Sequence, residues 1–142
     1  MILDGEAASL AFGVRLADVV APGDVITLSG PLGAGKTSIS RGLIAALGHE
    51  GEVPSPTFSI VQPYENLDPP VWHVDLYRLE EEGELDELGL EAAEEGVLLV
   101  EWPSRAGRWA HALQLTLEID ERTGARRLTA EVPQAWKERW PL

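Results

Sequence analysis

The chain has 142 residues, so we expect a single domain over residues 1–142 with a full hydrophobic core. It has no cysteine, no apolar run long enough to span a membrane and no signal-peptide pattern, which together favour a cytoplasmic location. Its formal net charge of −13 argues against tight direct binding to nucleic acid, whose phosphates need neutralising lysine and arginine.

The first third of the chain has the pattern of a helix, a strand and a second helix. Residues 6–20 repeat apolar side chains at helical spacing and precede a Pro-Gly pair. Residues 24–29 form a short β-branched run that is typical of a buried parallel strand. Residues 38–47 again have one apolar helical face, and Gly48 is suited to end that helix.

The middle of the chain indicates a hairpin followed by an acidic segment. Residues 57–64 and 71–77 alternate well enough to be strands, and residues 66–70 between them have turn chemistry. Residues 80–95 contain many carboxylates and no basic residue. We interpret this segment as a solvated helix face, with a surface for a basic partner as the alternative.

The last third completes an α/β pattern. Residues 97–100 are a continuous apolar run, which predicts a second buried parallel strand. Residues 113–119 and 128–132 predict two more strands, and residues 134–140 a short terminal helix. We therefore expect a three-layer α/β fold, with a mixed, mostly parallel sheet flanked by helices and with added antiparallel hairpins.

Residues 30–37 read Gly-Pro-Leu-Gly-Ala-Gly-Lys-Thr, a complete phosphate-binding loop between a predicted strand and a predicted helix. This loop makes the expected α/β fold one of the phosphate-loop NTPase type. The glycines let backbone N–H groups turn toward phosphate oxygens. Lys36 can reach the β and γ phosphates, and the Thr37 hydroxyl can ligate Mg²⁺. The expected nucleotide-binding residues of this loop are Gly33, Ala34, Gly35, Lys36, Thr37 and Ser38.

Two carboxylates are candidates for the metal and the attacking water. Glu101 follows the apolar strand at its C-terminal end, where ligands collect in open α/β sheets. Asp75 shares one strand face with His73 and Tyr77, a polar stripe that a plain core strand would not need. The alternative for this stripe is the solvent face of an antiparallel hairpin.

Other segments admit both a functional and a structural interpretation. Thr57 lies in Ser-Pro-Thr-Phe, where many phosphate-loop proteins place a switch segment, but an ordinary rigid loop is an equal alternative. Trp102 is either a core residue or an anchor for a protein partner. Arg105 and Arg108 could reach phosphates, and surface positions are the alternative.

Four motifs in this order resemble the bacterial TsaE family, the small ATPase of tRNA threonylcarbamoyladenosine biosynthesis. They are Pro-Leu-Gly-Ala-Gly-Lys-Thr at 31–37, Ser-Pro-Thr-Phe at 55–58, His-x-Asp-x-Tyr-Arg at 73–78 and Val-Glu-Trp-Pro at 100–103. The similarity covers nearly the whole chain. Pro31 departs from it, because the family usually has an acidic residue or Asn at that position.

The resemblance implies a cytoplasmic enzyme that binds Mg-ATP and hydrolyses it slowly. It also implies docking on a TsaB–TsaD heterodimer, whose TsaD subunit transfers a threonylcarbamoyl group to adenosine 37 of tRNA. Repeated cycles of that reaction would require the ATP hydrolysis. The expected cofactors are therefore ATP and Mg²⁺, and the expected partner is a protein complex.

The resemblance also implies residue roles. Lys36 would hold phosphate and act in catalysis, and Thr37, Glu101 and Asp75 would hold the metal. Asp75 and Glu101 would also be catalytic, and Ser9 would lie near the nucleotide. Residues implied at the switch or the partner surface are Thr57, Tyr77, Arg78 and Trp102. Either Arg126 or Arg127 would approach the base, and the sequence does not choose between them.

The main alternative function is a phosphate-loop small-molecule kinase, with Arg105 and Arg108 as lid residues and Asp75 as the base. The chain is short for a kinase and has no evident acceptor pocket. A GTPase is disfavoured because no Asn-Lys-x-Asp guanine motif is present. A nucleotide-gated binding module without turnover would leave Asp75 without a role.

Overall fold

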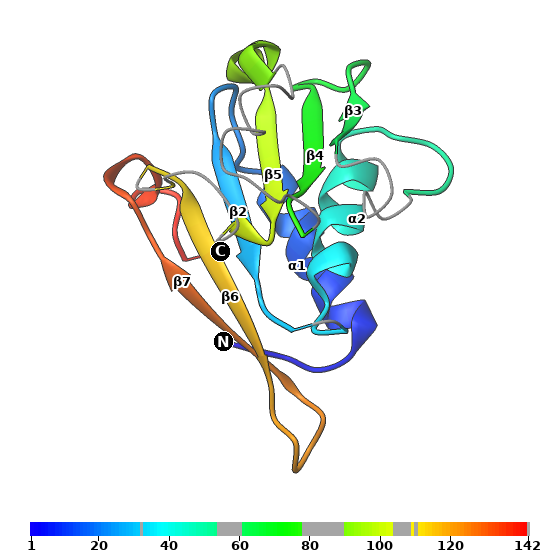
Figure 1. The fold of residues 1–142 in the computed structure, drawn as a ribbon, viewed down its shortest axis with the longest axis vertical. Coiled ribbons are helices and arrows are strands. Elements are labelled where there is room, and N and C mark those ends of the chain that lie inside the picture. The colour runs from blue at the N-terminus through cyan, green and yellow to red at the C-terminus, as the bar shows by residue number, and fades with distance from the viewer. Residues whose placement is uncertain (32, 54–60, 78–89, 104–108, 110, 142) are drawn as a thin grey trace.

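The computed structural model describes residues 1–31, 33–53, 61–77, 90–103, 109 and 111–141. In these residues a seven-stranded sheet is flanked by two α-helices (Figure 1). The strands are β1 (Ile2–Leu3), β2 (Val25–Ser29), β3 (Val61–Tyr64), β4 (Val71–Asp75), β5 (Val97–Glu101), β6 (Leu113–Ile119) and β7 (Arg126–Glu131). The helices are α1 (Glu6–Ala17) and α2 (Lys36–Ala46), with short 3₁₀ helices η3 (Leu90–Glu95) and η5 (Gln134–Trp136).

The sheet has a parallel core and antiparallel edges. Its strand order is β1-β7-β6-β2-β5-β4-β3. The central strands β6, β2, β5 and β4 are parallel, whereas β3 pairs antiparallel with β4, β7 with β6, and β1 with β7. This topology confirms the predicted α/β class, the mixed sheet with its mostly parallel core, and both hairpins.

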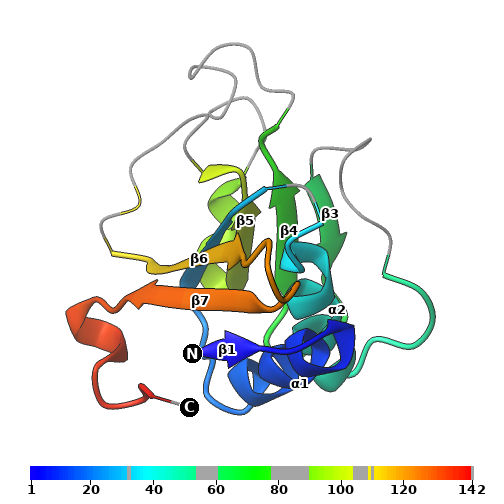
Figure 2. The same ribbon diagram turned by 90° about the horizontal axis from the view of Figure 1, so that it is seen from below.

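Hydrophobic side chains on the two faces of the sheet form two clusters. Helices α1 and α2 lie side by side over one face and bury the larger cluster with β2, β5 and β6 (Figures 1 and 2). On the opposite face of β4 and β5 a smaller cluster forms, to which Ala93 of η3 and Trp109 contribute. Strand alternation accounts for this division, because Leu99 and Leu98 point to opposite faces.

Two glycines allow α1 and α2 to approach closely. A Cβ added at Gly13 would lie 2.1 Å from the Ile39 carbonyl oxygen, and one at Gly42 would lie 2.1 Å from that of Leu10. Both distances are far below van der Waals contact, so only glycine fits at either position. The close crossing positions the start of α1 beside the loop that precedes α2.

Several predicted element boundaries need correction. Helix α1 ends at Ala17 rather than at residue 20, because the backbone N–H of Asp18 bonds to Arg15 and the chain turns before β2. The terminal helix expected over 134–140 is only a single 3₁₀ turn, η5, followed by turns. Strand β1 was not predicted, because two residues carry no detectable periodicity.

Other predicted boundaries differ from the structure by one or two residues. Helix α2 begins two residues earlier than expected and ends in a Schellman arrangement. Gly48 has φ 117°, and the N–H groups of Gly48 and His49 bond to Ala45 and Ile44. Strand β4 ends at Asp75 and β3 begins, within the described residues, at Val61. No described helix combines the length and apolarity needed to cross a membrane.

Candidate functional site

The phosphate loop connects β2 to α2 and contains left-handed glycines. Gly33 has φ 79° and Gly35, the N-terminal cap of α2, has φ 104°. A Cβ on Gly35 would also lie 3.0 Å from the Ser9 hydroxyl, which reaches the loop from the buried side of α1. Gly35 is thus required both by backbone conformation and by the proximity of Ser9.

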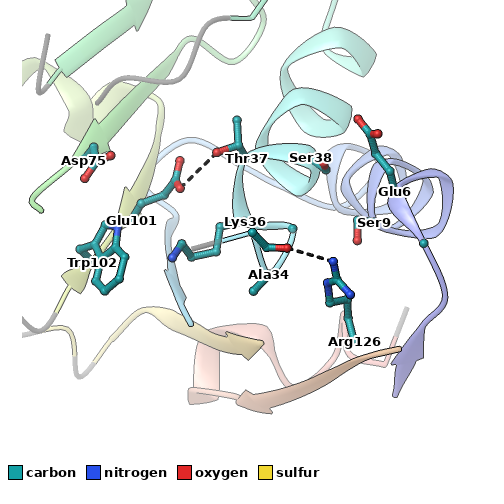
Figure 3. Close-up of a pocket in the computed structure, with 13 residues that line it drawn as sticks. Glu6, Ser9, Ala34, Lys36, Thr37, Ser38, Asp75, Glu101, Trp102 and Arg126 are labelled. Carbon is teal, nitrogen blue, oxygen red and sulfur yellow. Dashed lines mark hydrogen bonds between the residues drawn. The ribbon is translucent and has the colours of Figure 1, made fainter. Parts of the chain in front are cut away.

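Lys36 is buried at the start of α2 and lies along the inside of the loop. Its ammonium group donates to the backbone carbonyl of Gly30 and, at 3.3 Å, to that of Pro31. It also lies 3.9 Å from the centroid of the Trp102 ring (Figure 3). Burial lowers the pKa of Lys36 below 10.5, the usual lysine value, and the nearby negative charges of Glu101 and Asp75 partly oppose that shift.

Glu101 stands at the C-terminal end of β5 with its carboxylate shared between two partners. The Thr37 hydroxyl lies 3.5 Å from Oε1, at the limit of a hydrogen bond, and His73 Nε2 lies 2.6 Å from Oε2. Only 3% of Glu101 is exposed. The carboxylate is therefore enclosed between α2 on one side and β4 on the other.

Asp75 lies directly opposite Glu101 in the parallel pairing of β4 with β5. It is 5% exposed, and its Oδ1 accepts a hydrogen bond of 2.9 Å from the Tyr77 backbone N–H. This burial rules out the solvent-face alternative for the polar stripe at His73 and Asp75. The described part of the structure thus brings both predicted carboxylates to the same edge of the sheet as the phosphate loop.

Trp102 forms one wall of this site in an unusual backbone conformation. Its φ of 60° is the only positive φ of a non-glycine residue among the described residues. Its backbone N–H donates to Leu28 of β2 at 3.3 Å, and its ring lies 4.9 Å from that of Tyr77. Tyr77 is 41% exposed, so this aromatic pair joins the buried Lys36 to the protein surface.

These residues line one pocket of about 310 Å³. Asp75, Glu101 and Trp102 lie at one end, and α1 and Arg126 lie at the other (Figure 3). The full lining consists of Gly5, Glu6, Ser9, Gly33, Ala34, Gly35, Lys36, Thr37, Ser38, Asp75, Glu101, Trp102 and Arg126.

Among the described residues, Arg126 of β7 is the arginine that lines the pocket. Its guanidinium donates to the Gly33 carbonyl at 3.0 Å, which links the β6–β7 hairpin to the phosphate loop. Arg127 does not line the pocket, and it pairs with Ile2 of β1 in the sheet. Successive strand residues point to opposite faces of the sheet, so only one of these two neighbours can face the pocket. The strand register is needed to tell which one it is.

Some predicted site residues lie outside the described residues, namely Thr57, Arg78, Arg105 and Arg108. Residues 80–89 of the acidic segment also lie outside them, and the remainder of that segment includes η3. Conversely, sequence reasoning did not select Gly5 and Glu6 as lining residues, nor His73 as a partner of Glu101. The position of His73 on the same strand face as Asp75 was the one available signal.

Known proteins resemble this chain over most of its length. The family described as "Threonylcarbamoyl adenosine biosynthesis protein TsaE" matches residues 3–129. The chain belongs to the TsaE family. It is 43% identical over 118 residues to the TsaE protein of Streptomyces coelicolor, covering 79% of this chain and 78% of that protein. The Haemophilus influenzae TsaE protein is 31% identical over 130 residues, with 87% and 82% covered.

A third TsaE protein, from Bacillus subtilis, is 48% identical over 83 residues, which are 57% of this chain and 51% of that protein. Among solved structures, the crystal structure of Bacillus subtilis YdiB superposes with a TM-score of 0.78 at 28% identity, covering 98% of this chain and 88% of that one. The family expected from the four motifs and the fold expected from the element order are both confirmed.

Proposed function

We propose that this TsaE-family protein acts in tRNA threonylcarbamoyladenosine biosynthesis as a small ATPase that binds Mg-ATP and hydrolyses it slowly. The tRNA-modification role rests on family membership. One observation supports the ATPase activity above all. Lys36 and Thr37 of the phosphate loop share a single pocket with two buried carboxylates, Glu101 and Asp75.

The loop is suited to hold phosphates. Its glycines with positive φ allow backbone N–H groups to turn inward, and Lys36 adds a cation beside them. At Gly35 a Cβ would lie 3.0 Å from the Ser9 hydroxyl, so a larger residue there would have to displace Ser9. Lys36 now donates to the backbone carbonyls of Gly30 and Pro31, bonds that an anionic ligand would replace.

The residues present also suit a hard cation. Thr37 offers a hydroxyl, while Glu101 and Asp75 offer carboxylates, and oxygen donors are what Mg²⁺ requires. The described residues contain no group of three or more acidic or histidine ligands that could bind a metal alone. This fits a site in which phosphate and water supply the remaining ligands, as is usual for Mg²⁺. When bound, the ion would neutralise charge that develops on the phosphates.

The roles of the side chains follow from their positions. Lys36 would neutralise negative charge on the transferred phosphate. Asp75 is enclosed beside Glu101, where it can accept a hydrogen bond from the attacking water and orient it. Glu101, between Thr37 and His73, would complete the metal site. Trp102 covers Lys36 and limits the access of bulk water.

We propose further that the site is coupled to a TsaB–TsaD heterodimer. Tyr77 is exposed and its ring contacts that of Trp102 at a tilt of 53°, and Trp102 in turn covers Lys36. A protein seated on Tyr77 would therefore sense whether Lys36 is engaged by phosphate. A pull-down of TsaB and TsaD by the chain, with and without ATP, tests this proposal. Equal or absent capture in both conditions would contradict the coupling.

The ATPase assignment is tested by Asp75→Ala. We expect this variant to bind ATP with near-normal affinity, because the loop and Lys36 are retained. We expect turnover to fall by about 100-fold or more, the usual contribution of a group that handles a proton. Phosphate release without an added acceptor measures turnover, and titration calorimetry measures binding. The exposed Glu94→Ala is the matched control and should leave both unchanged.

Normal turnover by Asp75→Ala would contradict this role. A kinase would instead give a phosphorylated small molecule when the chain is incubated with a metabolite pool and ATP, detectable by mass spectrometry. A binding module would release no phosphate even with partner proteins present.

A further inference from the structure

His73 is a fully buried histidine in the middle of a parallel strand. It has no exposed surface, and its neighbours in β4 are the apolar Trp72 and Val74. Burying an imidazole costs free energy unless its nitrogens find partners, so an apolar side chain would stabilise a plain core position better. A specific polar contact is therefore needed to explain why histidine occupies this position.

Within the described residues that contact is Glu101. The Nε2 atom of His73 lies 2.6 Å from Oε2 of Glu101 in a buried hydrogen bond, and Nδ1 has no hydrogen-bond partner among the described residues. A carboxylate only accepts hydrogen bonds, so Nε2 carries the hydrogen in this contact. The polar chemistry of the ring is thus directed at one oxygen of one residue.

The contact crosses the sheet diagonally toward the site. In the pairing of β4 with β5, His73 lies opposite Leu99, whereas Glu101 lies opposite Asp75. His73 must therefore lean toward the C-terminal end of the strands to reach Glu101. His73 binds Oε2 of Glu101 from the N-terminal side of the strands. The other oxygen, Oε1, lies 3.5 Å from the Thr37 hydroxyl.

Without His73 the Glu101 carboxylate would be able to turn toward another charged group, Lys36. The charge of Lys36 is close enough to interact electrostatically with Glu101. A carboxylate released from His73 would rotate toward that ammonium group. Oε1 would then no longer face Thr37.

We propose that His73 is a positioning residue that fixes the Glu101 carboxylate so that one oxygen faces the magnesium position beside Thr37. This inference rests on the proposed Mg-ATP function of the site. Groups that orient a metal ligand commonly change metal affinity by about 10–100-fold when they are lost. His73 does not itself line the pocket, but it is hydrogen-bonded to Glu101, which does, so its effect on the site would pass through Glu101.

Two amide substitutions separate positioning from packing. The Gln amide nitrogen can take the place of Nε2, whereas the Asn amide is one methylene too short to reach Glu101. The readout is ADP binding by titration calorimetry over a range of Mg²⁺ concentrations, including none. Thermal unfolding of each variant reports whether it is folded.

We expect His73→Asn to bind ADP normally without Mg²⁺ and to need about 10–100-fold more Mg²⁺ to reach its tight-binding state. His73→Gln should need nearly the same Mg²⁺ concentration as the unmodified chain to bind ADP tightly. In a Glu101→Gln background, His73→Asn should cause no further loss of the Mg²⁺-dependent part of ADP affinity. Unchanged Mg²⁺ dependence in His73→Asn, or an equal loss of ADP affinity with and without Mg²⁺, would overturn the positioning role.

The same experiment distinguishes failure of this inference from failure of the proposed function. If the unmodified chain shows no effect of Mg²⁺ on nucleotide binding, or if Glu101→Gln retains the full effect, the proposed magnesium role of Glu101 is wrong and the inference falls with it. If both behave as expected and only His73→Asn matches the unmodified chain, the inference alone is wrong.

Discussion

At the scale of single residues, Lys36 is a buried cation held at the position where the loop would bind phosphate. Its ammonium group is desolvated at the base of the loop and is held by two backbone carbonyls and the Trp102 ring. Desolvation disfavours the charged form, and Glu101 and Asp75 only partly oppose this effect. A phosphate ligand would provide the negative charge that this environment lacks.

The sign of the resulting pH dependence follows from this description. In the free protein the pKa of Lys36 lies below 10.5, and bound phosphate should raise it because a negative charge favours the protonated form. Nucleotide affinity should therefore be constant below the free-state pKa and fall as pH rises above it. We expect this fall to begin at a lower pH than an ordinary lysine would give.

NMR of the chain with ¹³C-labelled lysine would measure this directly, because Lys137 is the only other lysine. Lys36→Arg identifies the Lys36 resonance by its loss. An Nζ titration at or above 10.5 in the free protein, or no upward shift with ADP, would contradict the role of burial argued here.

At the scale of elements, the crossing of α1 and α2 connects packing to the site. The crossing depends on Gly13 and Gly42, and it places Ser9 beside Gly35 of the phosphate loop. Separating the helices would thus move one wall of the pocket. The position of Ser9 near the loop is a consequence of helix packing rather than of any local motif.

Gly13→Ala should destabilise the protein even though alanine favours helix by about 1 kcal/mol over glycine. The added Cβ meets rigid backbone at 2.1 Å, and such overpacking costs about 1–3 kcal/mol or more. Urea unfolding measures this loss, and ADP titration should show weaker binding as α1 shifts. Val14→Ala, on the exposed side of the same helix, should change stability by no more than about 0.5 kcal/mol. A stabilised Gly13→Ala variant would show that the helices can separate without cost.

At the scale of the whole molecule, a C-terminal segment beyond the family match completes the core. The family match ends at residue 129, yet Trp136 is 1% exposed and belongs to the larger hydrophobic cluster. Arg139 stacks on the Trp136 ring at 3.8 Å and pairs with Asp24, just before β2, at 2.6 Å. Trp140 meets Phe12 of α1 edge-on. This segment thus joins the sheet to α1.

We expect Trp136→Ala to lower the free energy of unfolding by about 3–5 kcal/mol, the usual cost of deleting a large aromatic side chain from a core. Denaturant unfolding measures it. The exposed neighbour Lys137→Ala should stay within about 0.5 kcal/mol of the unmodified chain. A small effect of Trp136→Ala would mean that the segment contributes little to the core.

Local chemistry in the sequence was sufficient for the order of the elements from α1 to β7 and for the phosphate loop. The continuous apolar run of β5 indicated a buried parallel strand, and the glycine loop between β2 and α2 is read from adjacent residues alone. The same holds for Gly48, whose αL conformation ends α2. These features depend on neighbours in the chain, so their patterns are visible without a fold.

Other features depend on residues that are distant in the chain. The choice of Arg126 over Arg127, the burial of Asp75 and the contact between His73 and Glu101 follow from strand register. Strand β1 and the packing of Trp136 likewise exist only through partners far along the chain.

By itself, then, the sequence determined the phosphate loop, the order of the strands and α-helices from α1 to β7, and the family through four spaced motifs. Only the tertiary structure decided how the site is assembled. It brought Glu101 and Asp75 side by side and placed Lys36 against Trp102. It also placed the Glu101 carboxylate within reach of both Thr37 and His73. The physical reason is that a motif is a property of adjacent residues. A shared carboxylate is a property of strand pairing and helix packing.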